Sequence, residues 1–272
     1  MKRDYIARVL AKARKELSYT LSGNMLSKVK GEGFDFAELN PYIEGMDSRK
    51  IYWNSLAKGG ALQYKTFFEE KEIYVVTALL LDGSLVFGEP VQKREKALES
   101  AAVIGYMTTS GGHIFSGFTF SQKGREILPP TKAPHAMEGF IYRTGAIDPL
   151  YTKLDYDMAL ERLFRSVKRR SLIFLIGDFL EIPNLGKLSK KHLVHAVIVR
   201  DRFEAHPKAL GESLLVDPQS GAEAELFFDE KTARHYAQKY REHDAKLHAA
   251  FHKAGVHWQY LYTDENAAAL LR

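Results

Sequence analysis

Apolar residues along the chain fall into two kinds of run. The first kind is continuous, rich in β-branched residues and short enough to be a strand buried on both faces. Such runs occupy Ile73–Leu81, Ser171–Gly177 and His192–Val199. The second kind has the spacing of an amphipathic helix, at Pro90–Met107, Asp157–Arg169 and Asp229–Ala254. Strands that alternate with helices predict an α/β fold, a Rossmann-like, mostly parallel sheet flanked by helices.

Shorter patterns complete the expected domain. A helix is expected over residues 3–17 and a strand over Ala61–Glu72. Another strand is expected at His113–Phe120, with Arg125–Leu128 pairing back on it as a short edge, and Pro129–Pro149 has the Gly and Pro punctuation of a loop. The turn signal Asp217–Gly221 lies between two short apolar runs and predicts a hairpin before the last long helix. A final strand is expected after that helix, at His257–Tyr262.

The N-terminal part has a different character. Gly31 to Trp53 is dense in aromatics, glycines and paired opposite charges, so we expect it to be ordered against the rest of the chain. The expected organisation is an N-terminal extension over residues 1–70, packed on a main domain over residues 71–272, which ends in the hairpin and long helix.

Composition narrows the class of protein. The 272 residues carry a net charge of +5, from 39 basic and 34 acidic residues, and no cysteine. The basic excess is mild, and no aromatic residues interleave with the basic clusters, so nucleic-acid binding is not expected. No apolar run has the length of a membrane span, and a cytoplasmic location is the default expectation.

Two aspartates are the first candidates for chemistry. Asp82 and Asp178 each end a buried strand, and in a doubly wound sheet the carboxyl ends of such strands lie along one edge, where ligands bind. With the hydroxyl of Ser84 and a threonine from the loop before the Asp157 helix, the group offers only hard oxygen ligands, which suit Mg²⁺ or Ca²⁺. The alternative is that each aspartate only caps the helix that follows it.

Enzyme motifs have weaker support. Leu80–Leu85 resembles the first motif of haloacid-dehalogenase-type phosphatases, but leucine at position 80 cannot be the nucleophile. His248 and His252 are four apart on a helix without the glutamate of a metalloprotease motif. The enzyme hypothesis that remains is a metal-assisted phosphoester hydrolase that uses Asp82 and Asp178.

A longer set of residues resembles a known family, the domain of unknown function 58 family. Its typical pattern is Gly-x-Gly-x-Glu-Phe, then Arg-x-Tyr, then Gly-Asp-Asp-x-Arg-x-Ile-Asp-Trp, then a strand that ends in Asp-x-Ser-x-Ser. The matching residues are Gly31, Gly33, Phe34, Phe36, Tyr42, Gly45, Asp47, Arg49, Ile51, Trp53, Asp82 and Ser84. The resemblance runs from about Gly23 to the C-terminus.

The resemblance implies a von Willebrand factor A-like fold with a metal-ion-dependent adhesion site. That site is built from Asp-x-Ser-x-Ser, a threonine and an aspartate, matched here by Asp82, Ser84 and Asp178. Thr152 is the nearest threonine, although alignment puts Leu154 at that position. Val86 stands where the second serine is usual and offers no oxygen, so the expected site for Mg²⁺, Mn²⁺ or Ca²⁺ is degenerate and binds weakly or not at all.

The resemblance also implies a function. Members of the family are often encoded beside MoxR-type AAA+ ATPases and are thought to act as adaptors in chaperone-like assembly. The leading hypothesis is therefore a non-enzymatic interaction module that works with such an ATPase on a client protein. We expect its partner contacts at the Asp82 and Asp178 edge, or on the aromatic segment that contains Asp47, Arg49 and Trp53.

Overall fold

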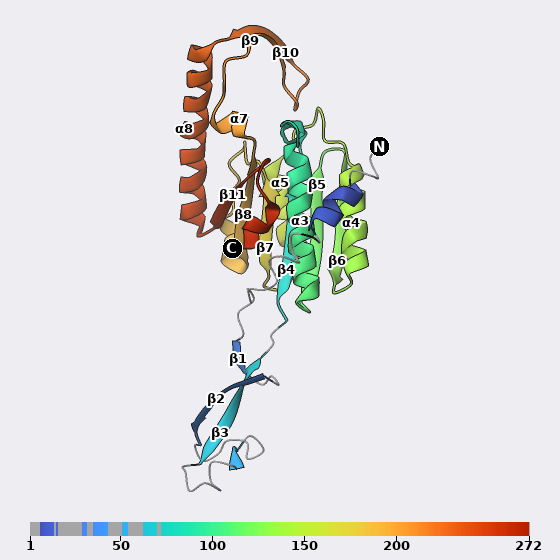
Figure 1. The fold of residues 1–272 in the computed structure, drawn as a ribbon, viewed down its shortest axis with the longest axis vertical. Helices are drawn as coiled ribbons and strands as arrows, with labels where there is room; N and C mark the ends of the chain where they lie inside the picture. Colours follow the sequence, from blue (N-terminus) through green and yellow to red (C-terminus); the bar gives the residue numbers. More distant parts are fainter. Residues whose placement is uncertain are drawn as a thin grey trace. The chain divides into compact units, whose positions relative to one another are not determined.

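The computed structural model divides the chain into two compact units, residues 1–22 with 73–272, and residues 23–72. Residues 6–13, 15, 29–31, 35–42, 51–53, 62–69 and 72–271 are described. The main unit contains a six-stranded sheet with helices on both faces (Figure 1). The expected α/β fold with a mostly parallel sheet is confirmed.

The strand order of this sheet is β11-β8-β7-β4-β5-β6. Five strands are parallel, and the edge strand β6 runs antiparallel to β5. The strands are β4 (Tyr74–Leu80), β5 (Ile114–Ser121), β6 (Gly124–Thr131), β7 (Leu172–Gly177), β8 (Leu193–Arg200) and β11 (His257–Tyr262).

The order of the sheet reverses between two neighbouring strands. From β4 the chain crosses to β5 on one side, and it later returns to place β7 on the other side of β4. The carboxyl ends of β4 and β7 therefore flank a topological switch point, which is where open α/β sheets hold their ligands. Asp82 and Asp178 follow these two ends.

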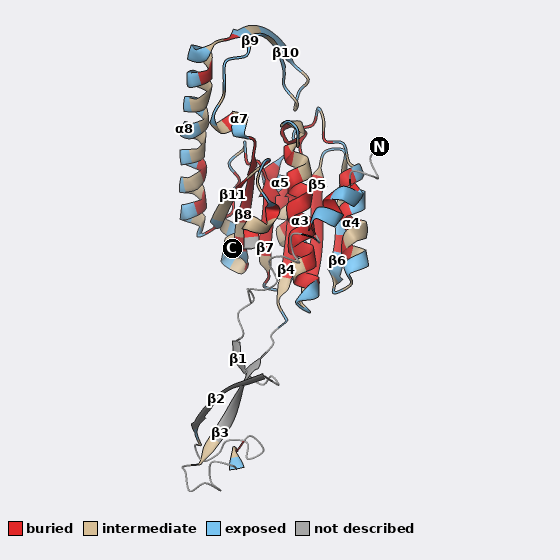
Figure 2. Ribbon diagram, in the orientation of Figure 1, coloured by how far each residue is buried: buried red, intermediate tan, exposed pale blue. Residues whose placement is uncertain are grey.

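Two hydrophobic cores lie on opposite faces of the sheet, because successive side chains of a strand point to opposite faces. In β4, Val75 and Leu79 enter one core, and Val76 and Leu80 enter the other. Figure 2 shows the strands and α3 as the buried centre of the unit. Helices that cover the first face are α3 (Lys93–Ser110), α4 (Pro134–Ala146) and the terminal turn η3 (Ala267–Leu271). Helices that cover the second face are α5 (Tyr156–Ser166), α6 (Gly186–Lys191) and α8 (Glu230–Ala254).

The segment expected to be a loop, Pro129–Pro149, contains helix α4. Pro134 occupies the first turn of this helix, where a missing backbone N–H costs nothing because that N–H has no helical partner. Its inner face buries Met137, Phe140 and Ile141. The prediction of a loop from the prolines and glycines of this segment was therefore wrong for residues 134–146.

Residues 6–13 are helical and belong to the main unit. Ile6, Val9, Leu10 and Ala13 are buried in the first core, at the spacing of one helix face. The structure thus groups residues 1–22 with the main domain, whereas the sequence-based division placed them in the extension.

The smaller unit contains a three-stranded antiparallel sheet of order β1-β3-β2. Its strands are β1 (Val29–Gly31), β2 (Asp35–Pro41) and β3 (Gln63–Glu69).

The expected hairpin is present in the main unit as β9 (Gly211–Val216) and β10 (Glu223–Phe228), between the short helix α7 (Arg202–Ala205) and α8. Within the described ranges, no helix combines the length and apolar character needed to cross a membrane.

Candidate functional site

The β4 end of the candidate site is shaped by a short helical turn, η2 (Gly83–Val86). Asp82 is its N-cap, and the Asp82 carboxylate accepts a hydrogen bond from the Ser84 backbone N–H at 3.1 Å. The turn directs the Ser84 hydroxyl toward the end of β7, where Asp178 follows Gly177. The capping role expected as an alternative for Asp82 is therefore present, together with a contact between the two strand ends.

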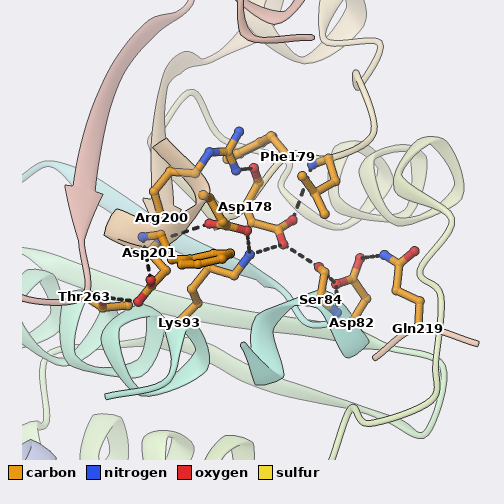
Figure 3. Close-up of polar contacts among 12 residues, drawn as sticks. Asp82, Ser84, Lys93, Asp178, Phe179, Arg200, Asp201, Gln219 and Thr263 are labelled. Carbon is orange, nitrogen blue, oxygen red and sulfur yellow. Dashed lines mark hydrogen bonds and ion pairs between the residues drawn. The ribbon is translucent and has the colours of Figure 1, made fainter. Parts of the chain in front are cut away.

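Ser84 joins the two carboxylates. Its Oγ contacts Asp82 Oδ1 and Asp178 Oδ2 (Figure 3). A hydroxyl has a single proton to donate, so a second close oxygen contact needs either a proton on one carboxyl or a cation. Asp82, Ser84 and Asp178 are 2%, 4% and 0% exposed, so water cannot screen the two charges.

A buried lysine lies on the other side of Asp178. Lys93 Nζ is 3.1 Å from Asp178 Oδ2 and 2.6 Å from Glu204 Oε1. Lys93 opens α3, and Glu204 lies in α7 after β8, so three elements meet at this ammonium group. The lysine is fully buried, and its charge is balanced by two carboxylates.

Arg200, at the end of β8, completes the positive side of the cluster. It donates from Nη1 to the backbone carbonyl of Asp178 and from Nη2 to Asp244 at 3.0 Å. Its guanidinium lies 4.9 Å from the ring centre of Tyr240. The arginine therefore fixes the backbone at Asp178, while Lys93 contacts its carboxylate.

The pKa values of the two aspartates are shifted in opposite directions. Burial and the charge of Asp178 raise the pKa of Asp82 to about 7, against the weaker lowering effect of Ser84 and Lys93. Burial also disfavours ionised Asp178, but Lys93 and Arg200 outweigh it and leave the pKa of Asp178 below its usual range. The pKa of Lys93 is raised, because its two carboxylate partners outweigh the effect of burial. The cluster thus contains a firmly charged Asp178–Lys93 pair beside a carboxyl that exchanges its proton near neutral pH.

The tip of the β9–β10 hairpin covers Asp82. Gln219 donates from Nε2 to Asp82 Oδ2 at 3.2 Å (Figure 3), and the Tyr151 N–H donates to the Pro218 carbonyl at 2.8 Å. A Cβ on Gly83 would lie 1.9 Å from that same carbonyl oxygen. Glycine is therefore required at position 83 by the close approach of the hairpin tip.

Comparison with known proteins assigns the chain to a family. The model of DUF58, a family of unknown function, matches residues 38–246, which is more than half of the 272 residues. The chain belongs to the DUF58 family. The family resemblance of the sequence is thereby confirmed, and the six-stranded sheet is arranged as its von Willebrand factor A-like fold implies.

Relatives of this DUF58 protein include an uncharacterized protein of Mycobacterium tuberculosis. It is 24% identical over 261 residues, which are 93% of this chain and 82% of the relative. A solved aerotolerance-related membrane protein from Bacteroides fragilis aligns with a TM-score of 0.46 and 15% identity, over 73% of this chain and 94% of that chain. The SpRpn10 VWA domain aligns with a TM-score of 0.39 and 9% identity, over 74% and 94% of the two chains.

The DUF58 structure brings together three of the four expected metal ligands, Asp82, Ser84 and Asp178. Thr152 lies beside them, and its carbonyl accepts a hydrogen bond from the Gly83 N–H at 2.8 Å. However, the Thr152 hydroxyl donates to the Pro149 carbonyl at 2.5 Å, within its own loop. Its assignment as a ligand stays a prediction.

The expected partner-binding residues belong to the smaller unit. Asp47 and Arg49 lie outside the described residues. Trp53 is described, and 58% of its surface is exposed. Their role in partner binding stays a prediction.

Sequence reasoning missed Lys93, Glu204 and Gln219 at this DUF58 site. Lys93 opens the charged stretch Lys93–Lys96 and has the composition of a solvated helix start. One signal was available, because positions four and eight residues further along the helix are Ala97 and Ala101. Residues at that spacing share a helix face, so the small buried residues place Lys93 on the inner face.

The donor atoms fit a hard divalent cation in kind but not in number. Asp82, Ser84 and Asp178 supply three oxygens of the type that Mg²⁺ and Ca²⁺ prefer, and the crowding of two carboxylates on one hydroxyl is what a cation would relieve. In contrast, Val86 contributes no oxygen and Lys93 already places one positive charge on Asp178. The residues therefore suit at most a weakly held ion.

Proposed function

We propose that this DUF58 protein is a non-enzymatic interaction module that works with a MoxR-type AAA+ ATPase in the maturation or assembly of a client protein. The cytoplasm is the compartment we expect. The observation that carries the proposal is the buried, ion-paired cluster at the β4–β7 switch point, where Asp178 is held by Lys93 and Asp82 is covered by Gln219. Such a cluster positions a binding edge without presenting an accessible nucleophile.

The family assignment and the von Willebrand factor A-like sheet support this function, because open α/β sheets bind their ligands at the carboxyl edge. We further propose that the edge holds Mg²⁺ weakly through Asp82, Ser84 and Asp178, with Mn²⁺ or Ca²⁺ as substitutes. When bound, the ion would supply positive charge at this edge of the sheet. Lys93 and Arg200 hold Asp178 in position whether or not the ion is present.

A binding assay with purified proteins tests the adaptor function. The immobilised chain is incubated with the MoxR-type ATPase of the same organism, with and without ATP. We expect the ATPase to be retained by the wild type and lost with Asp82→Ala or Trp53→Ala. Met158→Ala, which truncates a similarly exposed apolar residue on α5 (49% exposed), is the matched control. Absence of retention by the wild type, or full retention by both test variants, overturns the proposal.

Calorimetric titration tests the metal separately. Mg²⁺, Mn²⁺ and Ca²⁺ are titrated into the wild type and into Asp82→Ala. Weak binding heat that disappears in Asp82→Ala supports the site, and absence of heat with all three ions leaves an adaptor that needs no metal.

One observation favours a second candidate, the metal-assisted phosphoester hydrolase. Burial and Asp178 raise the pKa of Asp82 to about 7, and a carboxyl that exchanges its proton near neutral pH is suited to acid–base catalysis. The assay is turnover of p-nitrophenyl phosphate and its bis-ester. Activity that is lost in Asp178→Asn and Asp82→Asn supports the hydrolase, and equal background rates in all three proteins exclude it.

A further inference from the structure

The β9–β10 hairpin is fixed at both of its ends. At its base, Phe228 is buried, with its ring centre 6.1 Å from that of Phe203 in α7 and 6.4 Å from that of Tyr236 in α8. At its tip, Pro218 and Gln219 make the contacts with the strand-end loops described above. The middle of the hairpin is therefore held in place between two anchors.

One face of this middle section is open to solvent. In an antiparallel ladder, directly opposed residues and those two positions away share a face. The pairing register places six residues on the open face, as the cross-strand pairs Glu212–Phe227, Leu214–Glu225 and Val216–Glu223. All six are exposed, and Figure 2 shows the hairpin largely in the colours of exposed and intermediate residues.

The open face carries three large apolar side chains that fold-stabilising contacts do not explain. Leu214, Val216 and Phe227 are 55%, 43% and 66% exposed. The opposite face is partly covered, because Phe228 is buried and Leu226 half-buried there, although Leu215 on that face is 37% exposed. A contiguous group of exposed apolar residues on an anchored element is typical of an interaction site.

Charge identifies the kind of partner. Each cross-strand pair of the open face combines one apolar residue with one glutamate. Within the part of the chain that the structure describes, Glu212, Glu223 and Glu225 form no ion pair with a lysine or arginine. This local acidic and apolar face is complementary to a cationic, apolar partner.

The length of the open face indicates which kind of structural element can cover it. Six residues of strand, at about 3.3 Å per residue, give a face of roughly 17 to 20 Å in length. An α-helix covers this length with about three to four turns of 5.4 Å. A helix with one apolar stripe bordered by lysine or arginine therefore fits the face in length and in charge.

We propose that the open face of the β9–β10 hairpin binds a cationic amphipathic helix of a partner protein. Leu214, Val216 and Phe227 contact the apolar stripe of that helix. Glu212, Glu223 and Glu225 pair with its basic residues. Its six residues belong neither to the proposed metal ligands nor to residues 23–72, so the proposal goes beyond the proposed adaptor edge and does not require it.

The test uses the full chain and two designed peptide probes. One is a fluorescein-labelled helix-forming peptide of leucine and lysine, about 18 residues long so that it forms a complete helix on binding. The second has glutamate in place of every lysine. By fluorescence anisotropy, we expect the wild type to bind the leucine–lysine peptide and not the leucine–glutamate peptide. Glu223→Lys with Glu225→Lys reverses this preference, and Leu214→Ser with Phe227→Ser weakens binding by at least about tenfold.

The matched control reverses two exposed glutamates of α8, Glu230→Lys with Glu242→Lys, and leaves peptide binding unchanged. Circular dichroism verifies that every variant is folded. Equal binding of the leucine–lysine peptide by all variants overturns the proposal, and so does failure of the wild type to bind it.

Sedimentation velocity tests whether a second copy of this chain occupies the open face. Self-association that Phe227→Ser abolishes assigns the face to a second copy of this chain instead and overturns the proposal. Loss of Mg²⁺ binding in Asp82→Ala without loss of peptide binding separates this interface from the proposed metal edge.

Discussion

Removal of the buried ammonium group of Lys93 is the most direct test of the electrostatic account of the site. Lys93→Met keeps a long apolar chain in place but leaves the carboxylates of Asp178 and Glu204, formerly 3.1 and 2.6 Å from the ammonium, without their cation. The three side chains are 1%, 0% and 5% exposed. Water therefore cannot replace the lost partner.

Breaking a buried ion pair by removing one partner costs about 3–5 kcal/mol. We expect the upper part of this range, because two carboxylates lose their partner. A loss of this size is a large fraction of the roughly 5–15 kcal/mol that stabilises a typical domain. Adding Glu204→Gln removes one of the unpaired charges, so we expect the double variant to be more stable than the sum of the single changes implies, by at least about 1 kcal/mol.

The assay is urea unfolding followed by tryptophan fluorescence. The chain has two tryptophans, and Trp53 lies in the smaller unit. A Trp53→Phe background leaves Trp258, which packs against Phe251 at 5.9 Å between ring centres in the main unit, as the reporter. A cost below about 1 kcal/mol for Lys93→Met, the range of exposed ion pairs, would refute the assignment of Lys93 as the cation that balances Asp178.

Substitutions at Asp82, Gly83 and Gly117 give three further predictions. Because the pKa of Asp82 is about 7 in the folded protein and 3.8 in the reference state, the folded state binds more protons between these values and this carboxyl lowers stability as the pH rises from about 4 to 7. Asp82→Asn should flatten this dependence and raise the free energy of unfolding at pH 8 by on the order of 4 kcal/mol, measured by urea unfolding across pH. Gly83→Ala places a Cβ 1.9 Å from the Pro218 carbonyl oxygen, so we expect the hairpin tip to be displaced and cut faster in limited proteolysis. Gly117→Ala places a Cβ 2.6 Å from the Phe140 ring, and this overpacking should cost about 1–3 kcal/mol in the same unfolding assay.

Alanine substitutions at open positions serve as controls. The nearest atom to a Cβ on Gly124 is 3.8 Å away, and on Gly186 it is 3.6 Å away, so each substitution should change stability by less than about 0.5 kcal/mol. Gly186→Ala is the control for proteolysis of the tip. A hairpin tip in Gly83→Ala that resists protease as well as the wild type, or a pH profile of Asp82→Asn that matches the wild type, contradicts the corresponding reasoning.

The buried strands were predictable because their sequences have only one suitable environment. Ile73–Leu81 and Ser171–Gly177 are predominantly apolar, and the observed strands β4 and β7 lie within these bounds. A parallel sheet covered on both faces is what such runs need. The position of Asp82 and Asp178 at one edge followed from that prediction, and the structure adds the contact through Ser84.

Other features depend on tertiary contacts that a single sequence does not contain. Helix α4 was missed because proline at its first turn looks the same in sequence as proline in a loop, and only the burial of Met137 and Phe140 distinguishes them. Lys93 was missed because a lysine among charged neighbours is normally solvated. Its burial depends on Glu204, which is 111 residues away in sequence. Gln219 is similarly remote from Asp82, at a separation of 137 residues.

The hydrogen bond from Gln219 to Asp82 has a thermodynamic consequence. It links the tip of an anchored hairpin to the proton affinity of a carboxyl at the carboxyl edge of the sheet. Any molecule that changes the position of the tip changes the free energy of placing a proton or a cation on Asp82. By reciprocity, protonation of Asp82 or its occupation by an ion changes the affinity of the hairpin for that molecule by the same factor. For a molecule that binds the hairpin tip, a titration of binding against pH therefore reports on events at Asp82, whereas the open face carries no group in contact with that residue.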